Sequence, residues 1–206
     1  RSTVLGKEHP EYATALENLA TLYTSTGNYR KAEPLLLEST IIVEKVLGPN
    51  HQETISNYAN LGSLYYRMGD FDKAALYLWK CKDLLEKNDG IAHPYYGRNQ
   101  HNLANLLRDK GEWAQAIEFY QKSRLVFSTS LGKEHPEYAS VTGDFSRCYW
   151  LSGDQAAALS TLKEADDLNK KYLINASRHL SEQELSVFAE SFKPHLSKTF
   201  SYSRHD

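Results

Sequence analysis

The stretch Leu5-Gly-Lys-Glu-His-Pro-Glu-Tyr-Ala13 decides the fold, because the same nine residues recur at Leu131–Ala139. Further matches fill the interval at a constant step of 42 residues: His9, His51, His93 and His135, and Gly27, Gly69, Gly111 and Gly153. Self-similarity at a fixed period indicates a chain built from stacked structural repeats. The sequence therefore predicts four repeats, which begin near residues 5, 47, 89 and 131.

Each repeat has the pattern of two helices joined by a tight turn. In the first repeat Leu16, Leu19, Ala20 and Tyr23 follow the i, i+3, i+4, i+7 spacing of a helical apolar stripe over residues 10–25. Gly27 suits a tight turn, because glycine tolerates a positive φ. Helices are expected over 10–25, 29–46, 52–67, 71–87, 94–109, 113–130, 136–151, 155–174 and 181–200. Small residues recur where the two helices must approach closely: Ala20, Gly62, Ala104 and Ser146, and Ala32, Ala74, Ala116 and Ala158.

These positions resemble the signature of the tetratricopeptide repeat, which in the first repeat is carried by Leu19-Ala20, Tyr23, Gly27, Tyr29 and Ala32. The 42-residue period and the Leu-Gly-x-x-His-Pro connector resemble arrays of the kinesin-light-chain type over residues 5–172. The pattern departs from the family at Gln52, which replaces the connector proline, and at Phe145 and Gln155 in the fourth repeat. The resemblance implies an all-α, right-handed solenoid of four helical hairpins.

We divide the chain accordingly into 1–4 (the tail of a preceding repeat), 5–46, 47–88, 89–130 and 131–174 (the four repeats), and 175–206 (a C-terminal capping or connecting helix). The start at Arg1 indicates a fragment of a longer protein. In the last segment Ser181-Glu182-Gln183-Glu184 forms a capping box. An apolar stripe follows it at Leu185, Phe188, Phe192 and Leu196. This segment resembles the connection between tetratricopeptide arrays and the caspase-like CHAT peptidase domain of bacterial proteins. A plain helix that covers the last hairpin is the alternative.

Composition narrows the class of protein. The chain is 41% hydrophobic and 24% charged, which is typical of a folded, soluble protein. A net charge of -2 disfavours binding to nucleic acid or to a membrane surface, because such proteins carry a basic excess. The sequence has no apolar run of about 18 residues that could span a membrane. Cys81 and Cys148 are interpreted as buried free thiols in a reducing compartment, which predicts a cytoplasmic protein.

No residue pattern predicts catalysis, a metal or a cofactor. The four connector histidines lie in successive repeats, about 8–10 Å apart or more, and cannot ligate one ion at about 2 Å. Each is expected to tie its own connector by hydrogen bonds. Neither cysteine has a histidine at helical spacing, so no nucleophilic pair is expected. We therefore predict that the chain is not an enzyme.

The resemblance implies instead that the first helix of each repeat lines a concave groove that binds a protein or peptide segment. The candidate groove residues are Asn18, Asn60, Tyr66, Arg98, His101, Asn102, Asn105, Arg108, Asp144, Arg147 and Trp150. The rows of equivalent positions that contain Thr14, Glu17, Thr21 with Ser63, and Thr24 are expected on the same face, with Arg67 in or near them. An asparagine amide can donate to and accept from a peptide unit, although these asparagines could equally brace the stack. The arginines predict a partner with acidic and apolar side chains, unless they pair with carboxylates inside the array. The alternative function is a regulatory arm of a CHAT-type peptidase, with that domain in cis.

Overall fold

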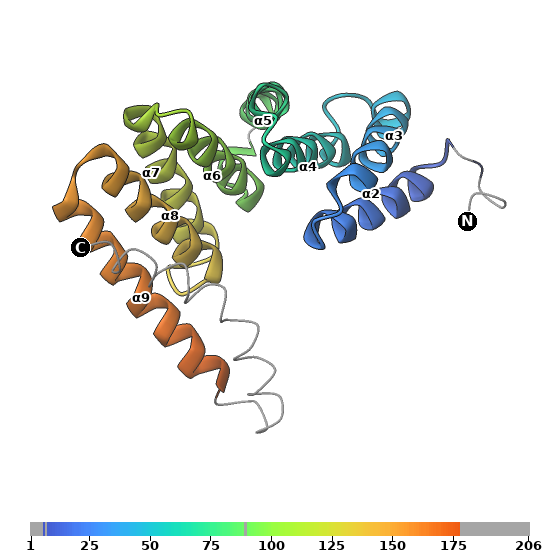
Figure 1. The fold of residues 1–206 in the computed structure, drawn as a ribbon. Helices are drawn as coiled ribbons and strands as arrows, with labels where there is room; N and C mark the ends of the chain where they lie inside the picture. Colours follow the sequence, from blue (N-terminus) through green and yellow to red (C-terminus); the bar gives the residue numbers. More distant parts are fainter. Residues whose placement is uncertain (1–5, 7, 89, 178–206) are drawn as a thin grey trace. The chain divides into compact units, whose positions relative to one another are not determined.

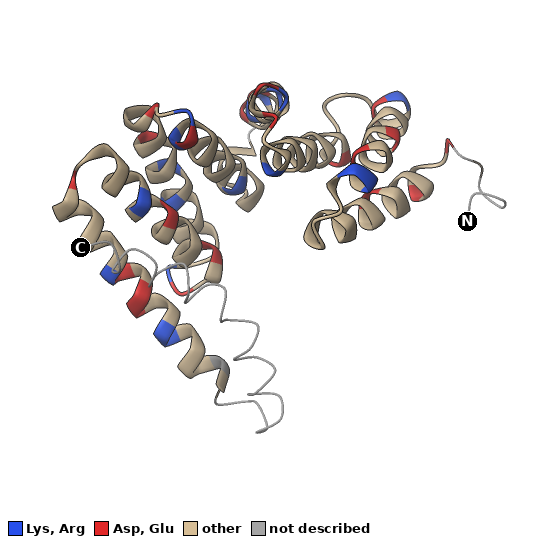
Figure 2. Ribbon diagram, in the orientation of Figure 1, with Lys and Arg blue, Asp and Glu red and all other residues tan. Residues whose placement is uncertain are grey.

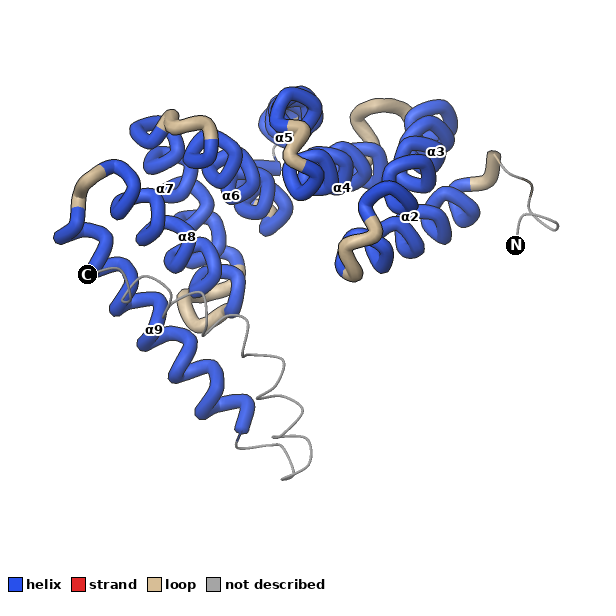
Figure 3. Tube along the Cα trace, viewed as in Figure 1, coloured by secondary structure: helices blue, strands red, loops and turns tan. Residues whose placement is uncertain are grey.

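The computed structural model describes residues 6, 8–88 and 90–177, and every regular element in this part of the chain is helical (Figures 1 and 3). The helices are α2 (Pro10–Ser25), α3 (Tyr29–Leu47), α4 (Gln52–Met68), α5 (Phe71–Lys87), α6 (Pro94–Asp109), α7 (Trp113–Ser130), α8 (Pro136–Ser152) and α9 (Gln155–Ser177), with a short 3-10 helix η1 (Gly90–Ala92). The predicted all-α fold is confirmed, and eight of the nine predicted helices are found in the described residues, with ends that differ by at most three residues. The helix predicted near 181–200 lies outside the described residues.

The chain forms two compact units, Arg1–Val126 and Phe127–Asp206, and the boundary between them falls inside α7. Each unit is described by itself. None of the helices in the described ranges combines the length and the apolarity needed to cross a bilayer. The repeat boundaries given above stay a prediction.

The connector histidines start the first helix of every repeat. His9, His51, His93 and His135 have extended backbones and are the N-caps of α2, α4, α6 and α8. In each case Nδ1 accepts a hydrogen bond from the backbone N–H two residues later, at 3.2–3.3 Å. The expected local role of these histidines is confirmed. An accepting Nδ1 carries no proton, so the neutral ring is protonated at Nε2.

The hairpin turns share one geometry. Gly27, Gly69, Gly111 and Gly153 have φ between 76° and 89°, a region that favours glycine. The residue after each glycine donates its N–H to the carbonyl five residues earlier, for example Asp70 to Tyr65 at 2.9 Å. This bond closes the end of the first helix. The turn places the second helix antiparallel to the first, so the two can bury their facing sides.

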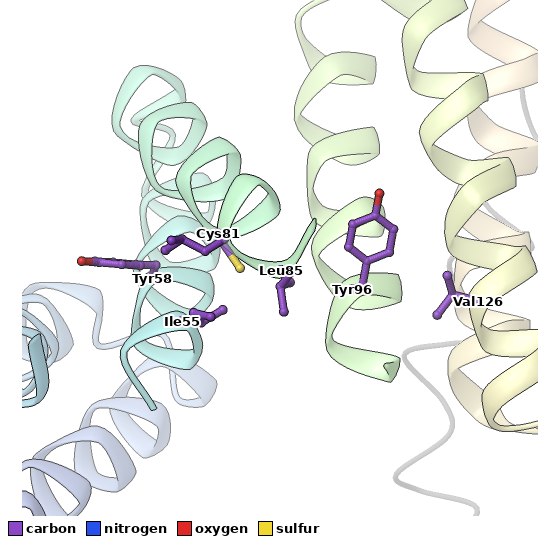
Figure 4. Packing of buried hydrophobic residues seen from close by; sticks show 7 residues of the cluster. Ile55, Tyr58, Cys81, Leu85, Tyr96 and Val126 are labelled. Carbon is purple, nitrogen blue, oxygen red and sulfur yellow. The ribbon is translucent and has the colours of Figure 1, made fainter. Parts of the chain in front are cut away.

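In the first unit the second helix of a repeat packs on the first helix of the next, α3 on α4 and α5 on α6. One core cluster collects side chains from α4, α5, α6 and α7 (Figure 4): Ile55, Tyr58, Cys81, Leu84, Leu85, Tyr96 and Val126. Ala20, Ala74 and Ala104 are fully buried, as expected for positions of close helix approach. At Gly62 the space is already filled, because an added Cβ would lie 2.6 Å from Cγ of Leu78.

The exposure of Leu19 differs from the prediction. The sequence predicts its side chain on the buried stripe of α2, but the side chain is 41% exposed, whereas the equivalent Leu61 and Leu103 are fully buried. Leu61 and Leu103 belong to helices that pack against the preceding hairpin. No described element packs on the corresponding side of α2. The repeat pattern therefore identifies the position, but a neighbouring hairpin is needed to bury it.

In the second unit α8 and α9 pair as a hairpin, and the Tyr138 hydroxyl donates to Glu164 across it at 3.0 Å. Phe145 and Tyr149 stack along α8, with ring centroids 4.4 Å apart. In both units basic and acidic residues are interspersed along the helices (Figure 2).

Candidate peptide-binding face

A recess on the predicted groove face lies between α2 and α4, in the first unit. It is a hollow of about 200 Å³. Its lining residues are mostly short and polar: Thr21, Thr24 and Ser25 from α2, Leu36 from α3, and Asn60, Ser63 and Arg67 from α4. The three α4 residues are spaced i, i+3, i+7 and therefore form one stripe of that helix. We call this recess the α2–α4 hollow.

Glu17 holds Asn60 beside the hollow. Oε1 of Glu17 accepts from Nδ2 of Asn60 at 2.8 Å and from the hydroxyl of Ser56 at 3.2 Å. Partial burial raises the pKa of the Glu17 carboxyl, the charge of Glu53 raises it further, and the hydrogen bonds from Ser56 and Asn60 lower it. A carboxylate can only accept hydrogen bonds, so the amide nitrogen of Asn60, and not its oxygen, must face Glu17. This contact fixes the orientation of the Asn60 amide.

Several donors in the hollow have no partner among the described residues. Thr21, Ser63 and Arg67 make no hydrogen bond or ion pair there. Thr24 and Ser25 differ, because their hydroxyls donate to carbonyls of their own helix, Ala20 at 2.8 Å and Leu22 at 2.9 Å. The hollow thus presents two hydroxyls and one guanidinium to an incoming group, which suits an acceptor such as a carboxylate.

Arg108 is used inside the molecule rather than at the surface. Its guanidinium is buried and donates to Asp109 (2.8 Å), to Oδ1 of Asn105 (2.8 Å) and to the hydroxyls of Tyr120 (2.9 Å) and Tyr66 (3.3 Å). Tyr66 in turn donates to Asp109 at 2.6 Å, and Tyr120 to Asn105 at 2.6 Å. This network joins α4, α6 and α7. The sequence analysis left two roles open for the arginines, binding an acidic partner or pairing inside the array. Arg108 pairs inside the array.

The other predicted residues are placed as follows. Arg98 on α6 is exposed, and its guanidinium lies over the ring of Tyr95 at 5.3 Å. His101 lies near the ring of Tyr120, with centroids 6.0 Å apart. Asn102 is half-buried and makes no hydrogen bond to a described residue, and Asn18 is exposed on α2. Asp144, Arg147 and Trp150 lie on α8 in the second unit, where Arg147 and Trp150 are exposed.

Ser25 is the lining residue of the hollow that the sequence prediction missed. Ser25 and Arg67 are equivalent positions 42 residues apart, and both line it. The predicted face of α2, with residues 14, 17, 18, 21 and 24, continues to residue 25, which is i+11 from residue 14. Extending the face by one position would have identified Ser25, which is equivalent to Arg67.

The two cysteines lie inside the helical core. Neither forms a disulfide, both are buried, and burial raises the pKa of the Cys81 thiol to about 12. Cys81 occupies the row of Ser39 and Ser123, whose hydroxyls donate at 2.8 Å to the carbonyls of Ala13 and Gly97. Within the described residues no three His, Cys, Asp or Glu side chains converge as metal ligands.

Comparison with known proteins identifies the repeat. The family model of the tetratricopeptide repeat matches residues 11–87 and 95–171. A solved structure from Podospora anserina, described as a kinesin light chain with nearly identical TPR-like repeats, superposes with a TM-score of 0.65 at 20% identity, covering 96% of this chain and 99% of that one. BtubC (BKLC) from P. vanneervenii superposes with a TM-score of 0.69 at 16% identity, covering 84% of this chain and 67% of that one. No curated protein matches the sequence.

The family match extends over most of the chain, and both solved structures share its fold. The repeat is generally a non-catalytic scaffold for protein–protein interaction. The chain belongs to the tetratricopeptide repeat family.

Proposed function

We propose that the chain binds a segment of a partner protein on the face shared by α2 and α4, with the α2–α4 hollow as the anchor for an acidic side chain. The observation that carries this is the set of unpartnered donors in one recess, namely Thr21, Ser63 and Arg67. A carboxylate accepts bidentately from arginine, and such charge-assisted bonds are about twice as strong as neutral ones. Leu36 adds an apolar wall, which favours a segment with apolar side chains beside the acidic one.

Backbone contacts fit the same proposal. Oδ1 of Asn60 accepts no hydrogen bond from a described residue, so it can accept from a peptide N–H. Asn102, the equivalent residue one repeat later, also makes no hydrogen bond to a described residue. Asn60 and Asn102 could therefore hold the backbone of an extended segment. Arg98 and His101, on the same helix as Asn102, would border its path.

The experiment is a selection of binders from a random peptide library, followed by affinity measurements on variants of the full chain. Arg67→Ala should weaken the selected peptides roughly two- to tenfold, since the pair is partly exposed to solvent. Thr21→Val removes a hydroxyl while it preserves side-chain shape and should weaken binding less. Arg30→Ala is the matched control, because Arg30 is exposed on α3 and does not line the hollow.

Equal losses for Arg67→Ala and Arg30→Ala would show that only net charge matters and would reject the hollow as the anchor. So would undiminished binding by an Arg67→Ala protein with an unchanged circular dichroism spectrum. Two broader predictions accompany the proposal: the regulatory arm of a CHAT-type peptidase, and a cytoplasmic location. Sequencing the gene beyond Asp206 tests the first, because a His–Cys pair in an α/β domain must follow. Cell fractionation tests the second.

A further inference from the structure

The α2–α4 hollow lies between opposite charges. At one end Glu17 contacts Asn60, and the negative charge of Glu53 is close enough to raise the pKa of Glu17. At the other end Arg67 lines the hollow together with Thr24 and Ser25. Asn60 and Arg67 are seven residues apart on α4, which is about 10 Å along the helix axis. The hollow therefore has the carboxylate of Glu17 beside Asn60 and the guanidinium of Arg67 near the C-terminal end of α4.

Between these charges, the acceptor of Asn60 is held in one orientation. Because Glu17 can only accept, Nδ2 of Asn60 points to Glu17 and Oδ1 remains for a ligand. A partner must then donate to Asn60 and accept from Ser63 and Arg67. A peptide unit that is followed by an acidic side chain has this order of donor and acceptor.

Resting on the proposed function, we infer that the bound segment carries a basic side chain beside Glu17 and an acidic side chain beside Arg67, so that it binds in one direction only. A uniformly acidic segment is disfavoured, because its other carboxylates would face Glu17 and Glu53. The two charged side chains must be about 10 Å apart. An extended segment spans this distance in about three residues and a helix in about seven.

The test uses the same random peptide library and a charge-swapped protein. Peptides selected on the wild-type chain should carry a basic and an acidic residue in a constant order. Peptides selected on the Glu17→Lys, Arg67→Glu double variant should carry them in the reverse order. Each set should bind its own protein at least fivefold more tightly than the other, because two partly exposed ion pairs are exchanged for two repulsions. Circular dichroism confirms that both proteins fold.

A matched pair of single variants separates the charge of Glu17 from its hold on Asn60. Glu17→Gln keeps an acceptor for Nδ2 of Asn60 and removes the charge, so it should abolish the preference for a basic residue, a change of roughly 1.5- to fivefold. Glu17→Leu removes both and should also weaken peptides whose binding depends on the Asn60 acceptor. Identical behaviour of the two variants would show that the orientation of Asn60 does not contribute.

The outcomes distinguish this inference from the proposed function. Selected peptides that depend on Arg67 but carry only acidic residues, or that keep their order on the swapped protein, overturn the inference and leave the binding site standing. A selection that yields no Arg67-dependent peptide overturns both. Peptides that carry one basic and one acidic residue, in an order that reverses on the charge-swapped protein, support both the inference and the proposed function.

Discussion

Gly62 offers a test of the packing, because two effects of opposite sign act there. In a helix interior alanine is favoured over glycine by about 1 kcal/mol. The Cβ of Gly62→Ala, however, would lie 2.6 Å from both Cγ and Cδ2 of Leu78 and 3.3 Å from its backbone nitrogen. Leu78 is fully buried and cannot rotate away into solvent. Overpacking a well-filled core costs about 1–3 kcal/mol, so the net result is about 1 kcal/mol of destabilisation.

Gly143 is the matched control, since it also lies inside a helix and has no positive φ. A Cβ there meets nothing within 4 Å. Gly143→Ala should therefore stabilise its helix by about 1 kcal/mol. Thermal and urea unfolding of the two variants should shift in opposite directions, each by about 2–4 °C in Tm. An equal rise for Gly62→Ala would refute the close approach of α4 and α5 at Leu78.

Three further predictions concern polar groups. Arg108→Met should destabilise by about 3 kcal/mol in urea unfolding, because it leaves Asn105 and Tyr120 without their shared donor, and a loss below about 1 kcal/mol would contradict the network. His51→Ala should lower the free energy of unfolding by about 1 kcal/mol, and His51→Asn should lower it much less, because asparagine is a good N-cap. Equal losses for the two variants would argue against the cap. Glu17→Gln should become more stable relative to wild type as pH rises: the folded-state pKa of Glu17 is raised, so its contribution is fully present below the unfolded pKa and is lost as pH rises through the folded pKa. Unfolding midpoints that move in parallel across pH 3–8 would exclude this.

The sequence predicted the helices and their ends because both depend on local, repeated signals. The period of 42 residues, the glycine turns and the histidine connectors recur in every repeat, and each acts within a few residues of the chain. The role of each histidine could be inferred even though its acceptor atom could not. The hollow was predicted in part, through Asn60 and the rows of Thr21 and Ser63.

The contacts that the sequence did not predict depend on several distant residues at once. Arg108 shares a row with Thr24, Tyr66 and Trp150, and nothing in that row indicates burial. Its environment requires Tyr66 in the preceding repeat and Tyr120 in the following helix. Asn60 likewise is held by Glu17, 43 residues earlier. Equivalence between repeats predicts which face a residue occupies, but not which neighbour engages it.

The histidine caps have a consequence for engineering this chain. Each cap is complete within three consecutive residues, from the imidazole to the N–H that it binds. A 42-residue block excised between two connectors therefore takes its own helix start with it and can be grafted or duplicated without redesign of that junction. The Arg108 network behaves differently, because it unites residues of adjacent blocks. The number of repeats can therefore be changed at the histidine caps, whereas the two blocks that contain Tyr66 and Arg108 must be transplanted together.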